Sequence, residues 1–437
     1  MLQIHRCFVL LLALMLLGAC DMVRTPQPPP SAVPTATPRP TPAPPPPTEA
    51  PPITALPQPT PEPSALSVWA VGTEAQADAL QHVIEGAAAQ AGVDVHVTVK
   101  SPDTLQADVR SNALAGLPQP DLFWGSQEDL GLLQRDELIT PATDGQSADA
   151  FIPATVAAAM LDGQRWGTPL AADGFLLLLY NKKIAAAAPQ TTDALIVASR
   201  DIKNSGKVGL VSAWAEPRWF VAWLTGTGGA LVGPDGAPTL DTPQVIAALN
   251  MLKELRVGGP STPSTYDDGV ALFTQGGAAF NIDGNWAIDD YRQYTDTLDL
   301  GVARMPLVPG TGRIAAPPLN GVYLMYGKDL TATRRPKAAM LMNALLAPAG
   351  QAALARELHM LPAKTSALGD EAVQSDPVLS KAAAQLDGAV GLPATKGVRC
   401  AFRVLAVALP EVLLGEWTPE QATEHMQTDA TACVSKP

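Results

Sequence analysis

Tryptophan and a carboxylate lie close together in one short stretch, SAWAEPRWFVAW (residues 212–223). Trp214, Trp219 and Trp223 are three of only 8 tryptophans in the chain, and Glu216 lies among them. A flat indole packs on apolar C–H faces, and a carboxylate accepts hydrogen bonds from hydroxyl groups. The combination suits a ligand that has both apolar C–H faces and hydroxyl groups. Indoles are also common in protein cores, so the stretch alone leaves both roles open.

The stretch is predicted to start a helix. Pro217 suits a first helical turn, which puts Glu216 at the helix start and Trp219 and Trp223 on one face. Glu216 then either contacts a ligand or simply interacts with the helix dipole. We expect Trp223, like Trp69 near the start of the folded region, to be part of a core.

Two more candidate positions lie beside predicted strands. Trp286 follows the turn Asp283-Gly284-Asn285 and does not lie within a helix, a placement that favours contact with a ligand over a place in the core. Asp173 precedes the apolar run from Phe175 to Tyr180, where it could line a site or cap the strand.

The folded region begins with a strand–helix–strand–helix–strand pattern. The segments LSVWAV, VDVHVTV and PDLFWG predict buried strands, and helical periods separate them. This order is typical of an α/β fold with a parallel sheet flanked by helices. Ligands bind at the carboxyl ends of such strands, which makes Trp124 and Ser126 candidates.

Composition narrows the class of protein. The formal net charge is −13 and the pI about 4.8, so nucleic acid is not an expected partner. Residues 64–437 exceed the usual size of one core, which predicts two lobes. His82, His96, His359 and His425 lie far apart in the sequence, and none is at ligand spacing with another ligand. We therefore expect no metal and no cofactor.

The N-terminus has the pattern of an export signal. Basic residues precede a wholly apolar run, Phe8–Leu17, which is too short to span a bilayer. The next residues, LLGAC, resemble the bacterial lipobox. The resemblance implies a signal peptide over residues 1–19 and a lipid on Cys20, which would anchor the protein on the outer face of the cytoplasmic membrane.

A proline-rich segment follows Cys20. Residues 25–63 hold 18 of the 43 prolines, a composition that cannot build a core and favours polyproline II. We expect residues 20–63 to be a tether. The two cysteines that remain in the exported region, Cys400 and Cys433, are predicted to form a disulfide.

Five segments in order resemble the extracellular solute-binding proteins of ABC importers, in the family typified by maltose-binding protein. They are PLAADGFLLLLYNKKI, AEPRWFVAWLTGTGGAL, NIDGNWAIDDY, KAAMLMNALLAPAGQAALARELHMLPA and LGEWTPEQATEHM. The resemblance implies two α/β lobes of the periplasmic-binding-protein fold, each a sheet flanked by helices and joined by crossing strands. One lobe would comprise residues 64–172 with 304–358, and the other 173–303 with 359–437. The crossings are placed near 171–174, 302–305 and 358–364.

The same resemblance implies roles for particular residues. Glu216 matches a sugar-binding Glu, Trp219 or Phe220 the stacking aromatic beside it, and Trp286 a stacking Trp. Asp173 matches an acidic cleft residue, although the family has the longer Glu there. Arg218 departs from the motif. Phe402, in place of a larger indole, matches a further aromatic, with Arg399 close by.

The predicted function is capture of a carbohydrate, maltose-like or oligosaccharide, and its delivery to the transmembrane subunits of an ABC importer, without catalysis. We expect a monomer. One alternative is the same fold binding another solute, such as a polyol, polyamine or peptide. Another is a lipid-anchored glycoside hydrolase, which needs two carboxylates set across the bond. No such pairing is recognisable, and neither is a Gly-x-Ser-x-Gly motif.

Overall fold

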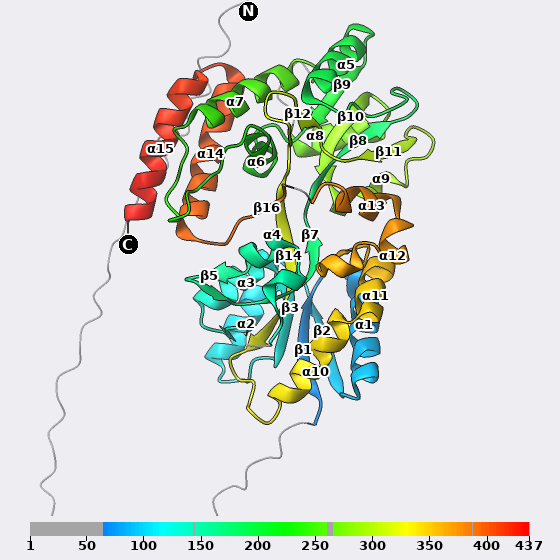
Figure 1. Cartoon of the computed structure of the whole chain (residues 1–437), viewed down its shortest axis with the longest axis vertical. Coiled ribbons are helices and arrows are strands. Elements are labelled where there is room, and N and C mark those ends of the chain that lie inside the picture. Colours follow the sequence, from blue (N-terminus) through cyan, green and yellow to red (C-terminus); the bar gives the residue numbers. More distant parts are fainter. Residues whose placement is uncertain (1–63, 143–144, 260–264, 387, 437) are drawn as a thin grey trace, which may run out of the picture. The chain divides into compact units, whose positions relative to one another are not determined.

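The structure, a computed structural model, describes residues 64–142, 145–259, 265–386 and 388–436 (Figure 1). The chain divides into two units, Met1–Pro61 and Glu62–Pro437, and only the second is described here. The predicted signal peptide, the lipid-bearing Cys20 and the proline-rich tether lie outside the described residues.

The larger of two main sheets has eight strands in the order β15-β7-β14-β3-β1-β2, with β4 and β16 also paired to β14. The first three strands are parallel, as the sequence predicts, and β14 runs antiparallel to β3 and β7. The strands are β1 (Leu66–Val71), β2 (Val95–Lys100), β3 (Leu122–Ser126), β4 (Ile139–Thr140), β7 (Thr168–Asp173), β14 (Pro318–Gly327), β15 (Leu361–Pro362) and β16 (Val390–Gly391).

Helices cover both faces of this sheet. On one face α1 (Ala77–Ala91), α10 (Arg335–Leu346) and α11 (Pro348–Leu358) pack over Val68 and Leu324. On the other, α2 (Leu105–Leu114) and α3 (Gln127–Arg135) pack over Phe123 and Tyr323. Within the described ranges no single helix is long and apolar enough to cross a membrane. The bent pair α10 and α11 passes such a test together, but both helices are part of this core.

The smaller sheet has four strands in the order β11-β8-β10-β9. Phe220 and Trp223 pack in its core, which agrees with the assignment of Trp223 to the interior. Its strands are β8 (Leu176–Asn181), β9 (Val208–Ser212), β10 (Ala278–Gly284) and β11 (Leu300–Ala303). Its helices are α5 (Thr192–Asn204), α6 (Pro217–Gly226), α7 (Pro243–Arg256), α8 (Tyr266–Thr274), α9 (Ile288–Tyr291), α14 (Lys396–Leu414) and α15 (Pro419–Ser435).

The chain passes between the sheets several times, and the sequence predicts three of these crossings. The first crossing, between the end of β7 at Asp173 and the start of β8 at Leu176, agrees with the prediction. The second comes later than predicted, just before β14, because the hairpin of β12 (Leu307–Val308) and β13 (Arg313–Ile314) intervenes.

The third crossing also comes later than expected. We placed it at residues 358–364, but β15 pairs with β7 and therefore belongs to the larger sheet. The chain reaches the smaller sheet only after α12 (Glu371–Gln374), where α13 (Pro377–Ala383) contacts β11. Short pairing segments such as β15 carry too few residues for a periodic pattern to reveal their partner.

One hydrophobic cluster joins the two sheets. It contains Ala172, Leu319 and Leu361 from the larger sheet and Leu177 and Leu179 from the smaller. The lobes therefore share packed side chains at the crossing strands. The remaining short elements are α4 (Pro153–Ala158), β5 (Met160–Leu161), β6 (Gln164–Arg165) and the 3-10 turns η1 (Glu74–Gln76), η2 (Ala148–Ala150), η3 (Asn285–Ala287) and η4 (Thr365–Ala367).

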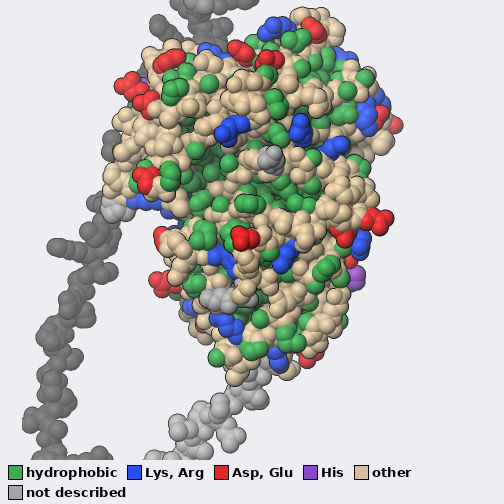
Figure 2. All heavy atoms as spheres, in the orientation of Figure 1, with side chains coloured by type: hydrophobic (Ala, Val, Ile, Leu, Met, Phe, Trp, Pro, Cys, Tyr) green, Lys and Arg blue, Asp and Glu red, His purple; other side chains and the backbone are tan. Residues whose placement is uncertain are grey.

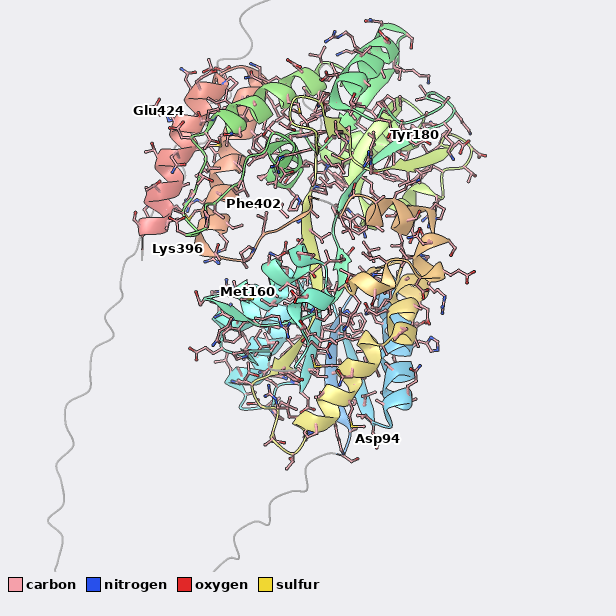
Figure 3. The ribbon with its side chains drawn as sticks, in the orientation of Figure 1. Asp94, Met160, Tyr180, Lys396, Phe402 and Glu424 are labelled. Carbon is pink, nitrogen blue, oxygen red and sulfur yellow. A yellow bond between two sulfur atoms is a disulfide. The ribbon has the colours of Figure 1, made fainter. Side chains whose placement is uncertain are left out.

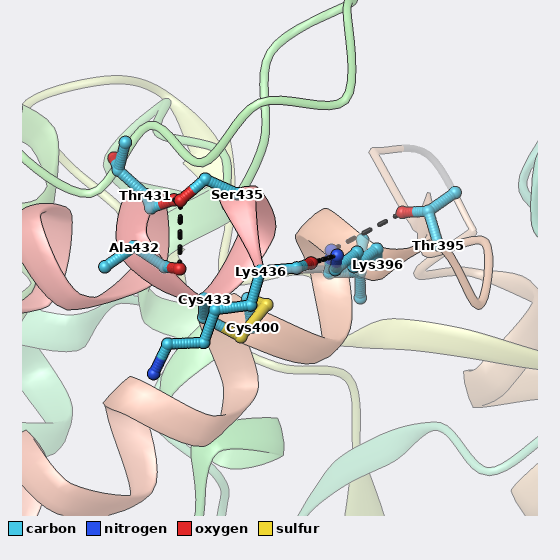
Figure 4. The surroundings of a disulfide bond; sticks show 9 residues. Thr395, Lys396, Cys400, Thr431, Ala432, Cys433, Ser435 and Lys436 are labelled. Carbon is cyan, nitrogen blue, oxygen red and sulfur yellow. Dashed lines mark hydrogen bonds between the residues drawn. A yellow bond between two sulfur atoms is a disulfide. The ribbon is translucent and has the colours of Figure 1, made fainter.

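The last two helices are covalently linked. Cys400 on α14 and Cys433 on α15 form a disulfide, with their Cα atoms 5.8 Å apart (Figure 4). Near the same end, Lys396 donates a hydrogen bond to the carbonyl of Lys436. Thr418 caps α15 and forms a capping box with Gln421. Figure 1 shows α14 and α15 side by side, next to α6 and α7.

Candidate functional site

An exposed indole stands at the end of the central strand of the smaller sheet. Trp286 is 46% exposed and belongs to η3, directly after β10. Its ring lies against Gly284, where an added Cβ would be about 2.1 Å from the ring. The glycine of the Gly-x-Trp motif thus gives the ring room to lie flat on the backbone. The edge of this indole meets Trp219, with centroids 6.1 Å apart and an interplanar angle of 83°.

Trp219 supports Trp286 from behind. It is only 8% exposed, and its Nε1 donates a 2.7 Å hydrogen bond to the carbonyl of Ile282. The ring of Tyr266 also packs against Trp219, with the two ring centroids 6.0 Å apart. The resemblance assigned Trp219 a stacking role, but in this structure it has little free face to offer. Its geometry is that of a residue that fixes the exposed indole.

A buried carboxylate lies under these rings. Asp283 is 1% exposed and accepts hydrogen bonds from the hydroxyls of Tyr266, at 3.1 Å, and of Tyr291. Burial raises the pKa of Asp283, although these hydrogen bonds oppose the rise. Burial and the neighbouring Asp283 charge raise the pKa of Tyr266 to about 12. This network was not predicted, because the local pattern assigns Asp283 only to a turn.

Trp286 and the Trp219 that supports it form what we call the indole platform. Hydrogen bonds connect this platform to the first crossing. The side-chain amide of Asn285 donates a 2.6 Å hydrogen bond to Asp173, and its oxygen accepts one from the backbone of Phe175 at 3.2 Å. The backbone N–H of Asn285 also donates to the Phe175 carbonyl at 3.1 Å. Asp173, predicted to line the cleft, therefore sits half-buried between β7 and the turn that carries Trp286.

Arg218 connects α6 to two of the crossing segments. Its guanidinium donates to Asn320 Oδ1 and to the Pro318 carbonyl, both at 3.1 Å, and also to the Gly174 carbonyl. Asn320 is paired with Asp173 across β14 and β7. Burial lowers the pKa of Arg218, while the nearby charges of Glu128 and Asp173 act in the opposite direction. The departure from the family motif at this position is therefore a cross-link in the hinge.

Glu216 precedes this arginine at the start of α6. It is exposed, and its side chain makes no capping hydrogen bond. Among the described residues, no hydrogen-bond donor or cation pairs with its carboxylate. Its oxygens are therefore available as hydrogen-bond acceptors two residues before the guanidinium of Arg218.

A cavity of about 360 Å³ is lined in part by Arg218. One wall is α3, and the opposite wall is the segment before α14 together with its first turns. Phe402 and Arg399, both predicted as site residues, line it, as do Pro318 and Asn320. Figure 3 shows Phe402 on α14 a short way along the helix from Lys396, and Figure 2 shows hydrophobic side chains gathered along the band where the lobes meet.

The two lobes touch at this cavity. Gln127 on α3 donates a side-chain hydrogen bond to the carbonyl of Leu392. Gly131 approaches Ala394 so closely that an added Cβ would lie 2.6 Å from the alanine Cβ. The cavity thus has one wall from the larger lobe and one from the segment that leads into α14. These are the surfaces that hinge motion moves in two-lobed proteins of this kind.

Two predicted residues need correction. Trp124 is 1% exposed in the core of the larger lobe, so it has no surface to offer a ligand. Ser126 caps α3: its hydroxyl accepts from the Asp129 N–H at 3.2 Å and donates to the Asp129 carboxylate at 2.8 Å. Helices cover both faces of the sheet, so Trp124 is buried within β3, while Ser126 at its end is occupied in capping α3.

A second cavity, of about 310 Å³, lies between α14 and α15. Trp417 and His425 stack there with centroids 4.7 Å apart. Of the predicted residues, it includes only Cys433. Throughout the described ranges no group of three or more His, Cys, Asp or Glu residues is placed to hold a metal ion.

Residues 83–381, well over half of the chain, match the family of bacterial extracellular solute-binding proteins. The chain belongs to this family, whose members bind solutes outside the cytoplasm.

Solved structures with the same fold include maltose- and maltodextrin-binding proteins. The MalE domain of Bdellovibrio bacteriovorus, bound to maltotriose, is 24% identical with a TM-score of 0.66, over 85% of this chain and 100% of that one. MalE of Listeria monocytogenes with maltose is 18% identical with a TM-score of 0.75, over 85% and 98%. The cyclic α-maltosyl-1,6-maltose binding protein of Arthrobacter globiformis is 20% identical with a TM-score of 0.72, over 85% and 99%. At these identities the likeness establishes the two-lobed fold.

Proposed function

We propose that this protein binds a carbohydrate between its lobes and delivers it to the membrane subunits of an ABC importer. The observation that carries the proposal is the exposed indole of Trp286, fixed flat by Gly284 and Trp219. A rigid aromatic face packs on the C–H face of a pyranose at low entropic cost. The free carboxylate of Glu216 supplies acceptors for sugar hydroxyls. Carbohydrate ligands in the similar structures support the proposal.

The N-terminal sequence extends this proposal to location. The lipobox-like LLGAC would place a lipid on Cys20, and the proline-rich segment after it would hold the binding lobes away from the membrane surface. A lipid-anchored receptor of this kind acts on the outer face of the cytoplasmic membrane. Mass spectrometry of the protein isolated from membranes tests this: a diacylated or triacylated Cys20 is expected, and an N-terminus without lipid contradicts the anchor.

The binding test uses the chain from Glu62 on, which forms one compact unit. Titration calorimetry with maltose, maltotriose and a panel of other sugars should find a saturable ligand. Trp286→Ala and Glu216→Gln should each weaken its binding by about tenfold or more, which corresponds to 1.4 kcal/mol or more. Tyr294→Ala is a matched control, because Tyr294 is exposed to a similar degree, at 48%.

The outcomes separate the candidate functions. Binding that depends on Trp286 but not on Tyr294 supports the proposal. If no sugar binds, or if Trp286→Ala leaves the affinity unchanged, the carbohydrate assignment is wrong. A polyol, polyamine or peptide that binds instead would place the protein among receptors for other solutes. Hydrolysis of a glycan in the same mixtures would indicate an enzyme.

A further inference from the structure

The cavity beside Phe402 differs in charge from the rest of the protein. Three arginines line it: Arg135 from α3, Arg218 from α6 and Arg399 from α14. The acidic residue among the lining side chains is Glu128, which is exposed. The whole chain has a formal net charge of −13. A positive cavity in an acidic protein favours a negatively charged partner at that place.

These arginines have no carboxylate partner among the described residues. In the part of the chain that the structure describes, Arg110 pairs with Asp136 and Arg334 with Asp121, but no such pair involves the three cavity arginines. Arg399 donates to the carbonyl of Ala394, and Arg218 donates to the neutral oxygens of the hinge.

Arg218 carries particular weight because it is largely buried, and burial lowers its pKa. A guanidinium out of water is costly without a counter-charge. Its neutral acceptors meet part of that cost, and Glu128 and Asp173 act on it only from a distance. A guanidinium fork also has five N–H donors in a plane that matches carboxylate and phosphate oxygens. Its three hydrogen bonds to Asn320, Gly174 and Pro318 use three of these five donors, and the same side chain lines the cavity.

We propose that this cavity holds the acidic group of an acidic sugar, a carboxylate or a phosphate. The inference rests on the proposed function and adds a substrate class to it. The sugar ring packs against the apolar side chains of this cavity, Phe402 among them. The oxyanion lies against the guanidinium groups of Arg218, Arg399 and Arg135. Charge-assisted hydrogen bonds of this kind are about twice as strong as neutral ones.

The alternative is that these arginines are only structural or solvated. Arg218 does cross-link the hinge, so its removal cannot separate the two roles. Arg135 and Arg399 are exposed and make no contact across the crossing strands, so they can be changed without disturbing the hinge. The double variant Arg135→Gln/Arg399→Gln is therefore the informative one. Arg403→Gln, an exposed arginine one turn further along α14 that lines the other cavity, is its control.

The probes are glucose, glucuronic acid and glucose 6-phosphate, which differ only at C6. Titration calorimetry on the chain from Glu62 on should find that at least one of the two acidic sugars binds about tenfold or more tightly than glucose. The comparison of the two distinguishes a carboxylate from a phosphate. The preference should weaken at about 0.5 M salt, where screening is strong. The double variant should lose most of it, and Arg403→Gln should keep it.

Contrary outcomes are distinct. If neither acidic sugar binds more tightly than glucose, the inference is overturned; the proposed function still stands if a neutral sugar binds in a Trp286-dependent way. If the preference exists but survives in the double variant, the anion is held elsewhere and the assignment to this cavity is wrong. If no sugar of any kind binds, the inference and the proposed function fail together.

Discussion

Asn285 holds Asp173 by a 2.6 Å hydrogen bond, and this contact links the turn that carries the exposed indole to the strand that crosses between the lobes. The two residues are 112 positions apart in the sequence. Any rotation of the lobes about β7 must therefore act on the base of Trp286. The contact couples the turn that carries Trp286 to the first crossing through one amide and one carboxylate.

The first prediction concerns this contact. Asn285→Ala and Asp173→Ala should each lower the free energy of unfolding and weaken ligand binding, and the two changes should not be additive. A hydrogen bond to a charged group contributes about 1.5–3 kcal/mol, so a double-mutant cycle should give a coupling energy of at least about 0.5 kcal/mol. Denaturant unfolding and titration calorimetry measure it. Purely additive effects would show that the contact is incidental.

The second prediction concerns Gly284. A Cβ at this position would collide with the ring of Trp286, so Gly284→Ala should move the indole and weaken sugar binding by about tenfold or more. Overall folding should survive, because the ring faces solvent and can swing away. Gly310→Ala is the control, since a Cβ there meets nothing within 4 Å. Binding that is unchanged in Gly284→Ala would remove Trp286 from the site.

The third prediction concerns pH. Burial raises the folded-state pKa of Asp283 above its unfolded value of about 3.9. The folded state therefore holds this proton more tightly. Its contribution to stability is complete below about pH 3.9 and is lost as the pH rises through the folded pKa. Subtracting the unfolding free energy of Asp283→Asn from that of the native chain, at each pH, should give a difference that falls from about pH 4 upward and then levels off. A difference that rises over this range would contradict the burial argument.

The fourth prediction concerns the disulfide between α14 and α15, which closes a loop with a sequence separation of 33. The double variant Cys400→Ser/Cys433→Ser should lose about 2–4 kcal/mol of unfolding free energy. Sugar affinity should change little, because the sulfurs lie outside the indole platform. Thiol titration of the unreduced, denatured chain should find no free thiol at these positions. Two free thiols would show that the bond does not form.

The sequence predicts most of the architecture because its signals are local. The three leading strands follow from their apolar runs, and α15 follows from Thr418, Pro419 and Gln421, all within four residues. The crossing between β7 and β8 lies where a strand pattern breaks at Asp173 and Gly174. The later crossings were misplaced because the hairpin β12–β13 and the two-residue strand β15 are too short to show a period.

In the candidate site, too, features with a local signal could be predicted and those that depend on distant contacts could not. Trp286, beside its glycine turn, and Phe402, near the start of α14, are candidates that local sequence provides, and their contact with a ligand stays a prediction. The burial of Trp124, in contrast, depends on helices packing over both faces of its strand. The cross-link made by Arg218 could not be predicted. Its partners are Gly174, Pro318 and Asn320, and no local pattern connects an arginine to carbonyl oxygens 44 to 102 residues away.

The hydrophobic cluster that contains Leu177, Leu319 and Leu361 belongs to both halves of the molecule at once. Neither half has a complete interior without the other, so heating should melt them together in one cooperative transition. Scanning calorimetry should therefore record a single unfolding peak, although the protein has two lobes.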